Sequence, residues 1–406
     1  MCKTRLNLKR ISVGILLILQ ICVISLFFNM QPSYKQSSRS SVSFLVATPN
    51  NKTDSKPTTY HTSHSKILLK SINTRKLYED FNSSLCYKKG TDIKLMKRSH
   101  NTWKCECLPG YHGIDCGQAE VIWRTLLTLR KPIQLKGRSF ERRIIYIFEI
   151  SEITRTISDI RLNELNQTVD LFVLYELNSD FMGNQMTYNF LKEFHDKILY
   201  LRVTKVDKLW FQVNRVIGNL KQDDLILVSG FNEIPNVAAL QFFKLYDNWP
   251  EPISFRLRWS VFGFFWIHPN KTFLKVQAFT KKYLYEGLNN RLSSIISNNK
   301  TTSNFNIGDL NHYGGWYCEF CNDPIKIIDE LNRLPKQIFD DGNAKTIDAN
   351  YVEELIENGI YIDGKTELLR AHRFRESYFA PTFLTENTWK YDYLMLNIYS
   401  KMDYYE

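Results

Sequence analysis

Apolar and polar positions divide the chain into an amino-terminal apolar run, a polar stretch and a long alternating body. The run Ile11 to Phe28 has 18 residues without a charge, which sits at the short end of what spans a hydrocarbon core of about 30 Å. Four basic residues precede it: Lys3, Arg5, Lys9 and Arg10. Because Lys and Arg stay on the cytoplasmic side, the pattern predicts a cytoplasmic tail (1–10), a single transmembrane signal anchor (11–28) and a lumenal bulk. The alternative is a cleaved signal peptide, but no small-x-small cleavage pattern follows.

The next segment, residues 29–82, is rich in Ser, Thr, Lys and Asn and contains few apolar residues. Such a composition cannot bury enough apolar surface to offset the entropy of ordering it. We therefore expect a flexible stem that holds the body away from the membrane.

The body alternates short strand patterns with helical ones. Four runs rich in β-branched and aromatic residues read as strands: 143–148, 169–175, 197–203 and 224–228. Helical spacing occurs between them, at 156–165, 189–195 and 210–220. This order predicts an α/β fold with βαβ units and a mostly parallel, buried sheet.

In parallel sheets ligands bind beyond the carboxyl ends of the strands. Glu176, which ends the second strand, and the segment Ser229 to Pro235, which follows the fourth, are the first candidates for a site. The sequence has no GxSxG elbow, HExxH, P-loop or GxGxxG, so the common hydrolase, ATPase and dehydrogenase classes lose support. An α/β body behind one anchor and a stem is a common layout of Golgi glycosyltransferases.

The net charge of +11 does not indicate a nucleic-acid partner. Residues 1–130 hold 20 Lys/Arg against 7 Asp/Glu, whereas residues 131–406 hold 33 against 35. A nucleic-acid-binding body normally carries its own basic face. We therefore expect no nucleic-acid partner.

Six of the eight cysteines lie in the predicted lumenal part, where disulfides form. Residues 105–116, CECLPGYHGIDC, look like the second half of an EGF-like module, which we place at 83–120. That resemblance pairs Cys107 with Cys116 and leaves Cys86 for Cys105. A structural collar between stem and body is the simpler role, and a protein-binding module is the alternative.

Cys318-Glu-Phe-Cys321 is a second close pair. A structural disulfide is the preferred interpretation, while redox or metal chemistry remains open. Five glycosylation sequons agree with a lumenal location: Asn51, Asn82, Asn166, Asn270 and Asn299.

Several ordered blocks of the body resemble one family. They begin with Lys244-Leu-Tyr-Asp247-Asn-Trp249-Pro-Glu251-Pro252 and Phe262 to Trp266. In chain order the other blocks are the Cys-x-Cys module, Glu176-x-Asn178 with Gly183, Glu233-Ile-Pro235, Gly315-Trp316-x-Cys318-x-x-Cys321, Asp348-Ala-Asn350-Tyr351, Gly359 to Gly364 and Ala380-Pro381. The chain resembles the β-1,4-mannosyl-glycoprotein 4-β-N-acetylglucosaminyltransferases over roughly residues 86–395.

The resemblance implies a GT-A-like, Rossmann-type nucleotide-sugar domain at 140–400 in a single-pass type II Golgi membrane protein. It implies UDP-GlcNAc as donor and the β-linked core mannose of an N-glycan on a glycoprotein as acceptor, with inversion at the anomeric carbon. Inversion needs a carboxylate as general base. The leaving diphosphate needs positive charge, usually Mn²⁺ or Mg²⁺ held by acidic side chains.

The sequence departs from the family after the fourth strand. Relatives carry Asp-Asp-x-Asp-Glu-Ile-Pro, whereas this chain reads Ser229-Gly-Phe-Asn232-Glu233-Ile-Pro. Glu233 is left as the candidate metal ligand, and Ser229 and Asn232 offer neutral oxygens to the nucleotide sugar together with Asn178. Arg215 is a candidate partner of the diphosphate, although a solvated helix position is its simpler role.

Candidate bases are Asp247, Glu176 and Glu251, followed by Asp309, Asp348 and Asp363. Each acid is also a plausible cap, turn or surface residue. The aromatic cluster Trp249, Phe264, Phe265 and Trp266 suits a sugar-stacking platform or, more often, a core. The depleted acids leave three hypotheses open: an active transferase, a non-catalytic relative that binds glycans or partner enzymes, and an adhesion or signalling ectodomain.

Overall fold

The computed structural model describes residues 42–44, 66–81, 84–98, 104–129, 131–177, 191–194, 196–296, 305–332 and 347–400, which belong to the compact unit Ser41–Glu406. Several predicted features lie outside the described residues: the tail, the anchor, most of the stem, Asn178, Gly183, Asn51, Asn82 and Asn299. Within the described ranges, no helix combines the length and the hydropathy that crossing a membrane requires.

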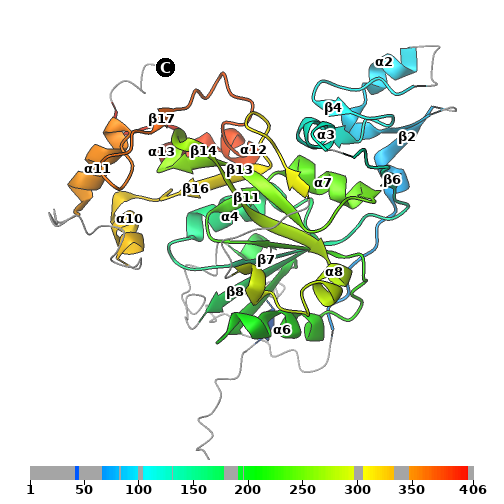
Figure 1. Cartoon of the computed structure of the whole chain (residues 1–406), viewed down its shortest axis with the longest axis horizontal. Coiled ribbons are helices and arrows are strands. Elements are labelled where there is room, and N and C mark those ends of the chain that lie inside the picture. The colour runs from blue at the N-terminus through cyan, green and yellow to red at the C-terminus, as the bar shows by residue number, and fades with distance from the viewer. Residues whose placement is uncertain are drawn as a thin grey trace, which may run out of the picture. The chain divides into compact units, whose positions relative to one another are not determined.

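The four predicted strands are present and run parallel (Figure 1). They are β7 (Ile144–Glu149), β8 (Leu171–Leu177), β9 (Ile198–Val203) and β10 (Leu225–Ser229), adjacent in the order β9-β8-β7-β10. Nearly all their side chains are buried, because helices cover both faces of this part of the sheet.

Alternate residues of β7 face different helices. Ile144, Tyr146 and Phe148 pack with α3 (Glu120–Leu127), α4 (Arg155–Leu165) and α7 (Val237–Leu245). Ile145 and Ile147 pack with α6 (Leu209–Val216) and α8 (Lys281–Glu286). Strand geometry produces this division, since successive side chains point to opposite faces.

Two predicted helices differ in extent from the expectation. The helix expected over 210–220 ends at Val216, because Ile217 is extended and forms a β-bridge with Ile67. Of the helix expected over 189–195, the described residues include the short 3₁₀ helix Lys192–Phe194.

The expectation of a mostly parallel sheet is wrong for the sheet as a whole. Among the described residues it has 11 strands, and β14 (Gly263–Thr280) lies antiparallel between β10 and β13 (Ile253–Val261). The hairpin turns at Phe262, whose φ is 62°. A turn this short needs no crossover helix, so the chain reverses direction instead of adding a parallel strand.

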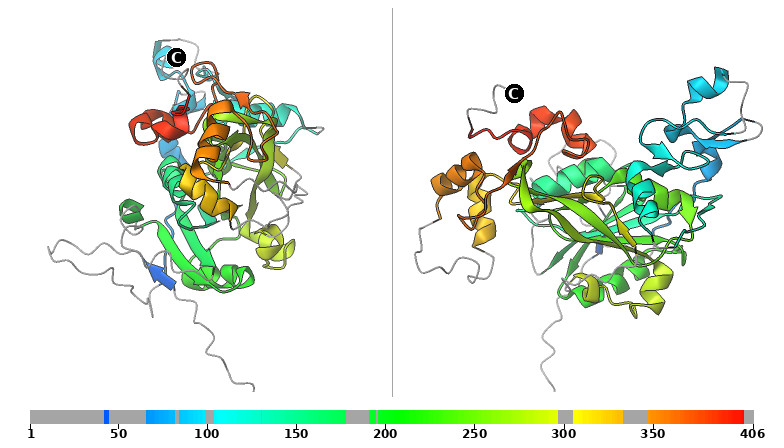
Figure 2. Two further views of the ribbon diagram at one scale, coloured as in Figure 1. Left: turned by 90° about the vertical axis from the view of Figure 1, so that its left-hand side faces the viewer. Right: turned by 45° about the horizontal axis from the view of Figure 1, so that its top comes forward.

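Short strands complete the sheet (Figure 2). They are β1 (Val42–Phe44), β11 (Glu233–Pro235), β15 (Phe305–Ile307), β16 (Gly315–Glu319) and β17 (Leu369–Arg370). A second core lies at the far end of the hairpin, where Phe264, Phe265 and Trp266 pack with the last helices. The helices of this second core are α10 (Pro324–Leu331), α11 (Ala349–Asn358), α12 (Thr382–Glu386) and α13 (Asp392–Met395). The short helix α9 (Ser293–Ile296) packs elsewhere, in the core beside α8.

A disulfide-linked segment lies between β1 and β7 in the chain. Cys86 is bonded to Cys105 and Cys107 to Cys116, as the EGF-like resemblance suggested. Its elements are β2 (Tyr78–Asp80), β3 (Leu85–Tyr87), α2 (Ile93–Arg98), β4 (Tyr111–His112) and β5 (Gln118–Ala119), followed by the small ladder of β6 (Lys136–Gly137) with β12 (Tyr246–Asp247). Tyr246 Oη donates to Asp115 at 2.6 Å and so joins this segment to the end of α7.

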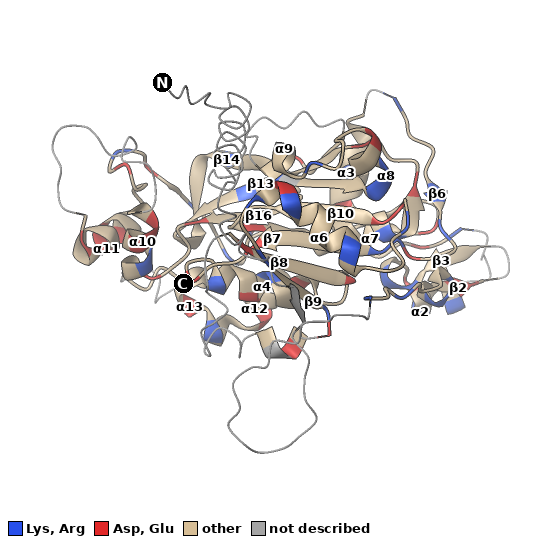
Figure 3. Ribbon diagram, turned by 90° about the horizontal axis from the view of Figure 1, so that it is seen from below, with Lys and Arg blue, Asp and Glu red and all other residues tan. Residues whose placement is uncertain are grey.

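Lys and Arg are interspersed with Asp and Glu over the drawn elements in the view of Figure 3. Neither sign forms a continuous stripe in that view.

Candidate functional site

The strand order changes direction between β7 and β10. From β7 the chain adds β8 and β9 on one side, and β10 then returns to the other side. In open α/β sheets a ligand crevice forms at such a switch point, outside the carboxyl ends of the strands. Here those ends are Glu149 of β7 and the segment from Ser229 to Glu233 after β10.

Glu233 occupies the centre of this edge. Its carboxylate is 1% exposed and accepts the backbone N–H of Gly230 at 2.6 Å. Lys275 of β14 places Nζ 3.7 Å from Glu233 Oε1. A Cβ at position 230 would lie 2.7 Å from the same carboxylate, so a larger residue there would displace the Glu233 side chain.

Arg161 of α4 binds the turn that follows β10. Its Nη2 donates to the carbonyls of Gly230 and Phe231 at 3.1 and 2.6 Å, and its guanidinium lies 4.3 Å from the Phe148 ring centroid. Its Nε and Nη1 are buried without a hydrogen-bond partner in the protein. A fully buried cation with unused donors therefore lies directly under the candidate site.

Glu319, the last residue of β16, is a second carboxylate on this side of the sheet. It accepts hydrogen bonds from Trp259 Nε1 at 2.8 Å, Tyr361 Oη at 3.1 Å and Tyr317 Oη at 3.3 Å. Burial raises the pKa of Glu319, against the lowering effect of these three donors. Tyr317 pairs with Glu233 across β11 and β16, and so lies between the two carboxylates.

The sequence analysis missed Arg161, Lys275 and Glu319. Arg161 lies in a helix and Lys275 in a strand, where the sequence pattern indicates only which residues are buried. No motif marks either residue. Glu319 lies between the paired Cys318 and Cys321, a signal that pointed to the cysteines alone. The Cys318–Cys321 disulfide is formed.

Three of the predicted site residues lie at the same carboxyl edge. Ser229 Oγ is 2.7 Å from Tyr146 Oη, and the Asn232 carbonyl accepts Cys318 N–H at 2.9 Å. Glu176 is fully buried at the end of β8, opposite Arg202 of β9. Asn178 follows outside the described residues.

Asp247, Glu251 and Arg215 lie at the opposite, amino edge of the parallel strands. Asp247 pairs with Arg138 and Arg142, which precede β7. Glu251 accepts the N–H of Thr280 at 2.7 Å, and Thr280 lies opposite the first residue of β10. Arg215 is exposed in the last turn of α6. The structure does not bring these three residues together with Glu233.

The remaining candidates have local partners. Asp348 caps α11, and Asp309 and Asp363 accept backbone N–H groups of their own turns. The aromatic cluster Trp249, Phe264, Phe265 and Trp266 is buried in the two cores. Of the predicted glycosylation sites, Asn166 is half-buried at the end of α4 and Asn270 is exposed.

A divalent ion at this edge stays a prediction. Mg²⁺ and Mn²⁺ need several oxygen ligands, and an ion held by the protein usually has more than one carboxylate. In the part of the chain that the structure describes, no three His, Cys, Asp or Glu side chains form a group that could hold a metal. Glu233 already faces Gly230 N–H and Lys275. The described donor set therefore does not fit a tightly held ion, and no step below depends on one.

The chain is similar to three proteins named β-1,4-mannosyl-glycoprotein 4-β-N-acetylglucosaminyltransferase. The Homo sapiens protein is 27% identical over 340 residues, which cover 73% of this chain and 63% of that protein. The Rattus norvegicus and Mus musculus proteins are each 28% identical, over 338 and 339 residues, and are covered to 62%. The chain thus spans less than two thirds of the length of these curated relatives. The sequence matches no family model and no solved structure. The chain is a distant homologue of the β-1,4-mannosyl-glycoprotein 4-β-N-acetylglucosaminyltransferases.

Proposed function

We propose that the protein is an inverting glycosyltransferase that moves GlcNAc from UDP-GlcNAc to the β-linked core mannose of N-glycans. The similarity to the named transferases over 73% of the chain carries this proposal. The change of strand order beside Glu233 supports it, because nucleotide ligands bind at such edges. A GT-A-like sheet agrees with four parallel strands followed by an antiparallel one.

Lys275 and Arg161 supply the positive charge at the proposed donor site. A metal ion held by three aspartates would otherwise neutralise the departing diphosphate, and this chain has Ser229, Gly230 and Asn232 in the positions of those aspartates. Lys275 is 32% exposed and lies at the edge, so its ammonium is available to a phosphate oxygen. Arg161 acts beneath the turn, where it fixes the carbonyls of Gly230 and Phe231.

Glu319 is the general base in this proposal. Its raised pKa makes the carboxylate a better proton acceptor than an ordinary glutamate. It takes the proton of the acceptor hydroxyl while that oxygen attacks the anomeric carbon of GlcNAc. The bond from that carbon to the diphosphate oxygen breaks, and UDP leaves with the electron pair. Trp259 and Tyr361 hold the carboxylate through their hydrogen bonds.

The location follows from the sequence and belongs to the proposal. The anchor predicted at 11–28 supports a single-pass type II membrane protein with its body in the Golgi lumen. Parts of the stem predicted at 29–82 pack on the body, since β1 pairs with β9 and Leu69 lies in its core. The protein's partners in the lumen are UDP-GlcNAc and glycoprotein acceptors.

A transfer assay on the full-length chain tests the proposal. UDP-GlcNAc and a biantennary glycopeptide are incubated with the protein, in parallel with Mn²⁺ and with EDTA, and a panel of other nucleotide sugars is included. We expect GlcNAc transfer above a heat-inactivated control. Absence of transfer from every donor under both conditions would refute the enzyme assignment and favour a non-catalytic glycan-binding relative.

A further inference from the structure

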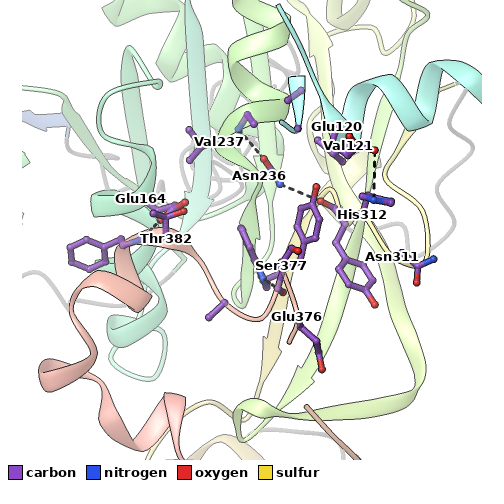
Figure 4. A pocket seen from close by; sticks show the side chains of 18 of the residues that line it. Glu120, Val121, Glu164, Asn236, Val237, Asn311, His312, Glu376, Ser377 and Thr382 are labelled. Carbon is purple, nitrogen blue, oxygen red and sulfur yellow. Dashed lines mark hydrogen bonds and ion pairs between the residues drawn. The ribbon is translucent and has the colours of Figure 1, made fainter. Parts of the chain in front are cut away.

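A large cavity is lined by residues of the disulfide-linked segment, α4, α7 and the carboxy-terminal part of the chain, and Glu233 is not among them (Figure 4). Its volume is about 1110 Å³, above the range of about 300–1,000 Å³ typical of small-molecule sites. Its lining includes Trp316, whereas Tyr317, the next residue of β16, lies toward Glu233. Because successive strand residues point to opposite faces, β16 separates the cavity from the proposed donor site.

The disulfide-linked segment forms one wall of the cavity. Lys89, Pro109, Gly110 and Tyr111 line it, and the two disulfides hold this loop. Tyr111 is fixed further, because its N–H donates to the Leu108 carbonyl at 3.0 Å and β4 pairs with β5. The segment therefore supplies part of the cavity wall in addition to linking the stem and the body.

The lining is about equally polar and apolar, and its charged side chains balance. Four carboxylates and four Lys or Arg side chains contribute to it. The amides of Asn163, Gln167 and Gln241 add both donors and acceptors, and the rings of Tyr111 and Tyr378 add apolar surface. A nucleotide or phosphate ligand would need an excess of cations, and a lipid would need an apolar lining. This combination suits a neutral molecule that has many hydroxyl groups and apolar ring faces.

The walls are held in place before any ligand binds. Trp316 Nε1 donates to the Tyr378 carbonyl at 3.0 Å, and Glu164 Oε2 accepts the Phe383 N–H at 2.7 Å. Glu120 accepts from Arg124 at 2.6 Å and lies 2.6 Å from His112 Nε2. Figure 4 shows Glu120, Glu164, Asn236 and Ser377, from distant parts of the chain, around the same space. Fixed polar groups bind with a smaller entropic cost than mobile ones.

We propose that this cavity is a second saccharide-binding site, which takes a neutral oligosaccharide. The site goes beyond the proposed transfer reaction and does not require it. In an active transferase it would hold an arm of a glycan while the acceptor hydroxyl reacts on the other face of β16.

Direct binding to the full-length chain tests the site in the absence of nucleotide. The probe is a neutral, GlcNAc-terminated biantennary N-glycan, measured by calorimetry, with its sialylated form as the charged comparison. Gln167→Arg adds bulk and charge at an exposed lining position at the end of α4. We expect about tenfold weaker binding for this variant, as for loss of one favourable contact. Tyr111→Ala is the second variant and should also weaken binding.

Tyr285→Ala is the matched control, because Tyr285 is 65% exposed on α8 and does not line the cavity. Unchanged binding in Gln167→Arg, with a wild-type melting temperature, would overturn the proposal, as would no binding to the wild type or a clear preference for the sialylated glycan. Glycan binding without GlcNAc transfer would refute the proposed enzyme activity and leave the second site supported.

Discussion

Lys275→Met tests the cation at the carboxyl edge of the sheet. The substitution leaves Glu233, which is 1% exposed, with the Gly230 N–H as its remaining partner among those described above. Breaking a fully buried ion pair costs about 3–5 kcal/mol. Lys275 is 32% exposed, so solvent screens the pair and we expect a loss of about 1–3 kcal/mol in the free energy of unfolding.

The same substitution should weaken nucleotide binding. A hydrogen bond to a charged group contributes about 1.5–3 kcal/mol. Since each 1.4 kcal/mol is about a factor of ten, the Kd for UDP should rise by roughly 10- to 100-fold. Lys275→Arg keeps the charge and should retain most of the affinity, although the longer side chain alters the geometry.

Calorimetric titration of the full-length protein with UDP in EDTA measures this effect, and thermal unfolding by circular dichroism reports the stability. Lys282→Met, an exposed substitution on α8, is the matched control. A folded Lys275→Met protein that binds UDP as tightly as the wild type would refute the role of Lys275 in the donor site.

Three further changes separate catalysis from structure. Glu319→Gln should reduce transfer by roughly 100-fold, since it removes the proposed base, with UDP affinity unchanged. Because burial raises the pKa of Glu319 above its ordinary value of 4.5, the folded protein holds this proton more tightly than the unfolded chain. The free energy of unfolding should therefore fall as the pH rises from the ordinary pKa of a glutamate through the raised pKa of Glu319. Denaturant titrations at several pH values should show that Glu319→Gln removes this dependence. Asp247→Asn should cost about 1–3 kcal/mol in chemical denaturation but leave kcat nearly unchanged, because Asp247 pairs with Arg138 and Arg142 at the amino edge. Cys107→Ala with Cys116→Ala opens a link of sequence separation 9, which should cost about 2–3 kcal/mol, seen as faster hydrogen exchange in that segment.

For each of these three predictions, one experimental result would contradict it. Full activity in Glu319→Gln would exclude it as the base, and Glu176→Gln is the parallel variant at the same edge. A large fall in kcat in a stable Asp247→Asn protein would return Asp247 to the catalytic candidates. Unchanged exchange in the double cysteine variant would show that the loop holds its shape without the bond.

The local patterns of the sequence were sufficient to predict the parallel strands β7 to β10. The β-branched runs of β7 to β10 reflect burial on both faces of the sheet, and the helical spacing of α4 reflects burial of one side of that helix. Each segment encodes its pattern within a few residues. The cysteine spacing likewise indicated the pairs Cys86–Cys105 and Cys107–Cys116 through the EGF-like resemblance. The antiparallel hairpin of β13 and β14 was not anticipated, because strand direction depends on pairing between segments and not on the residues of either strand alone.

The candidate site depended on the tertiary structure to a greater degree. Motif reasoning selected Asp247, Glu251 and Glu233 together, yet the fold places the first two at one end of the strands and Glu233 at the other. It also brings Arg161, Lys275 and Glu319 near Glu233 from elements far apart in the chain. A carboxylate or cation acquires its role from the charges and burial around it, and those surroundings are set by long-range packing that no local spacing records.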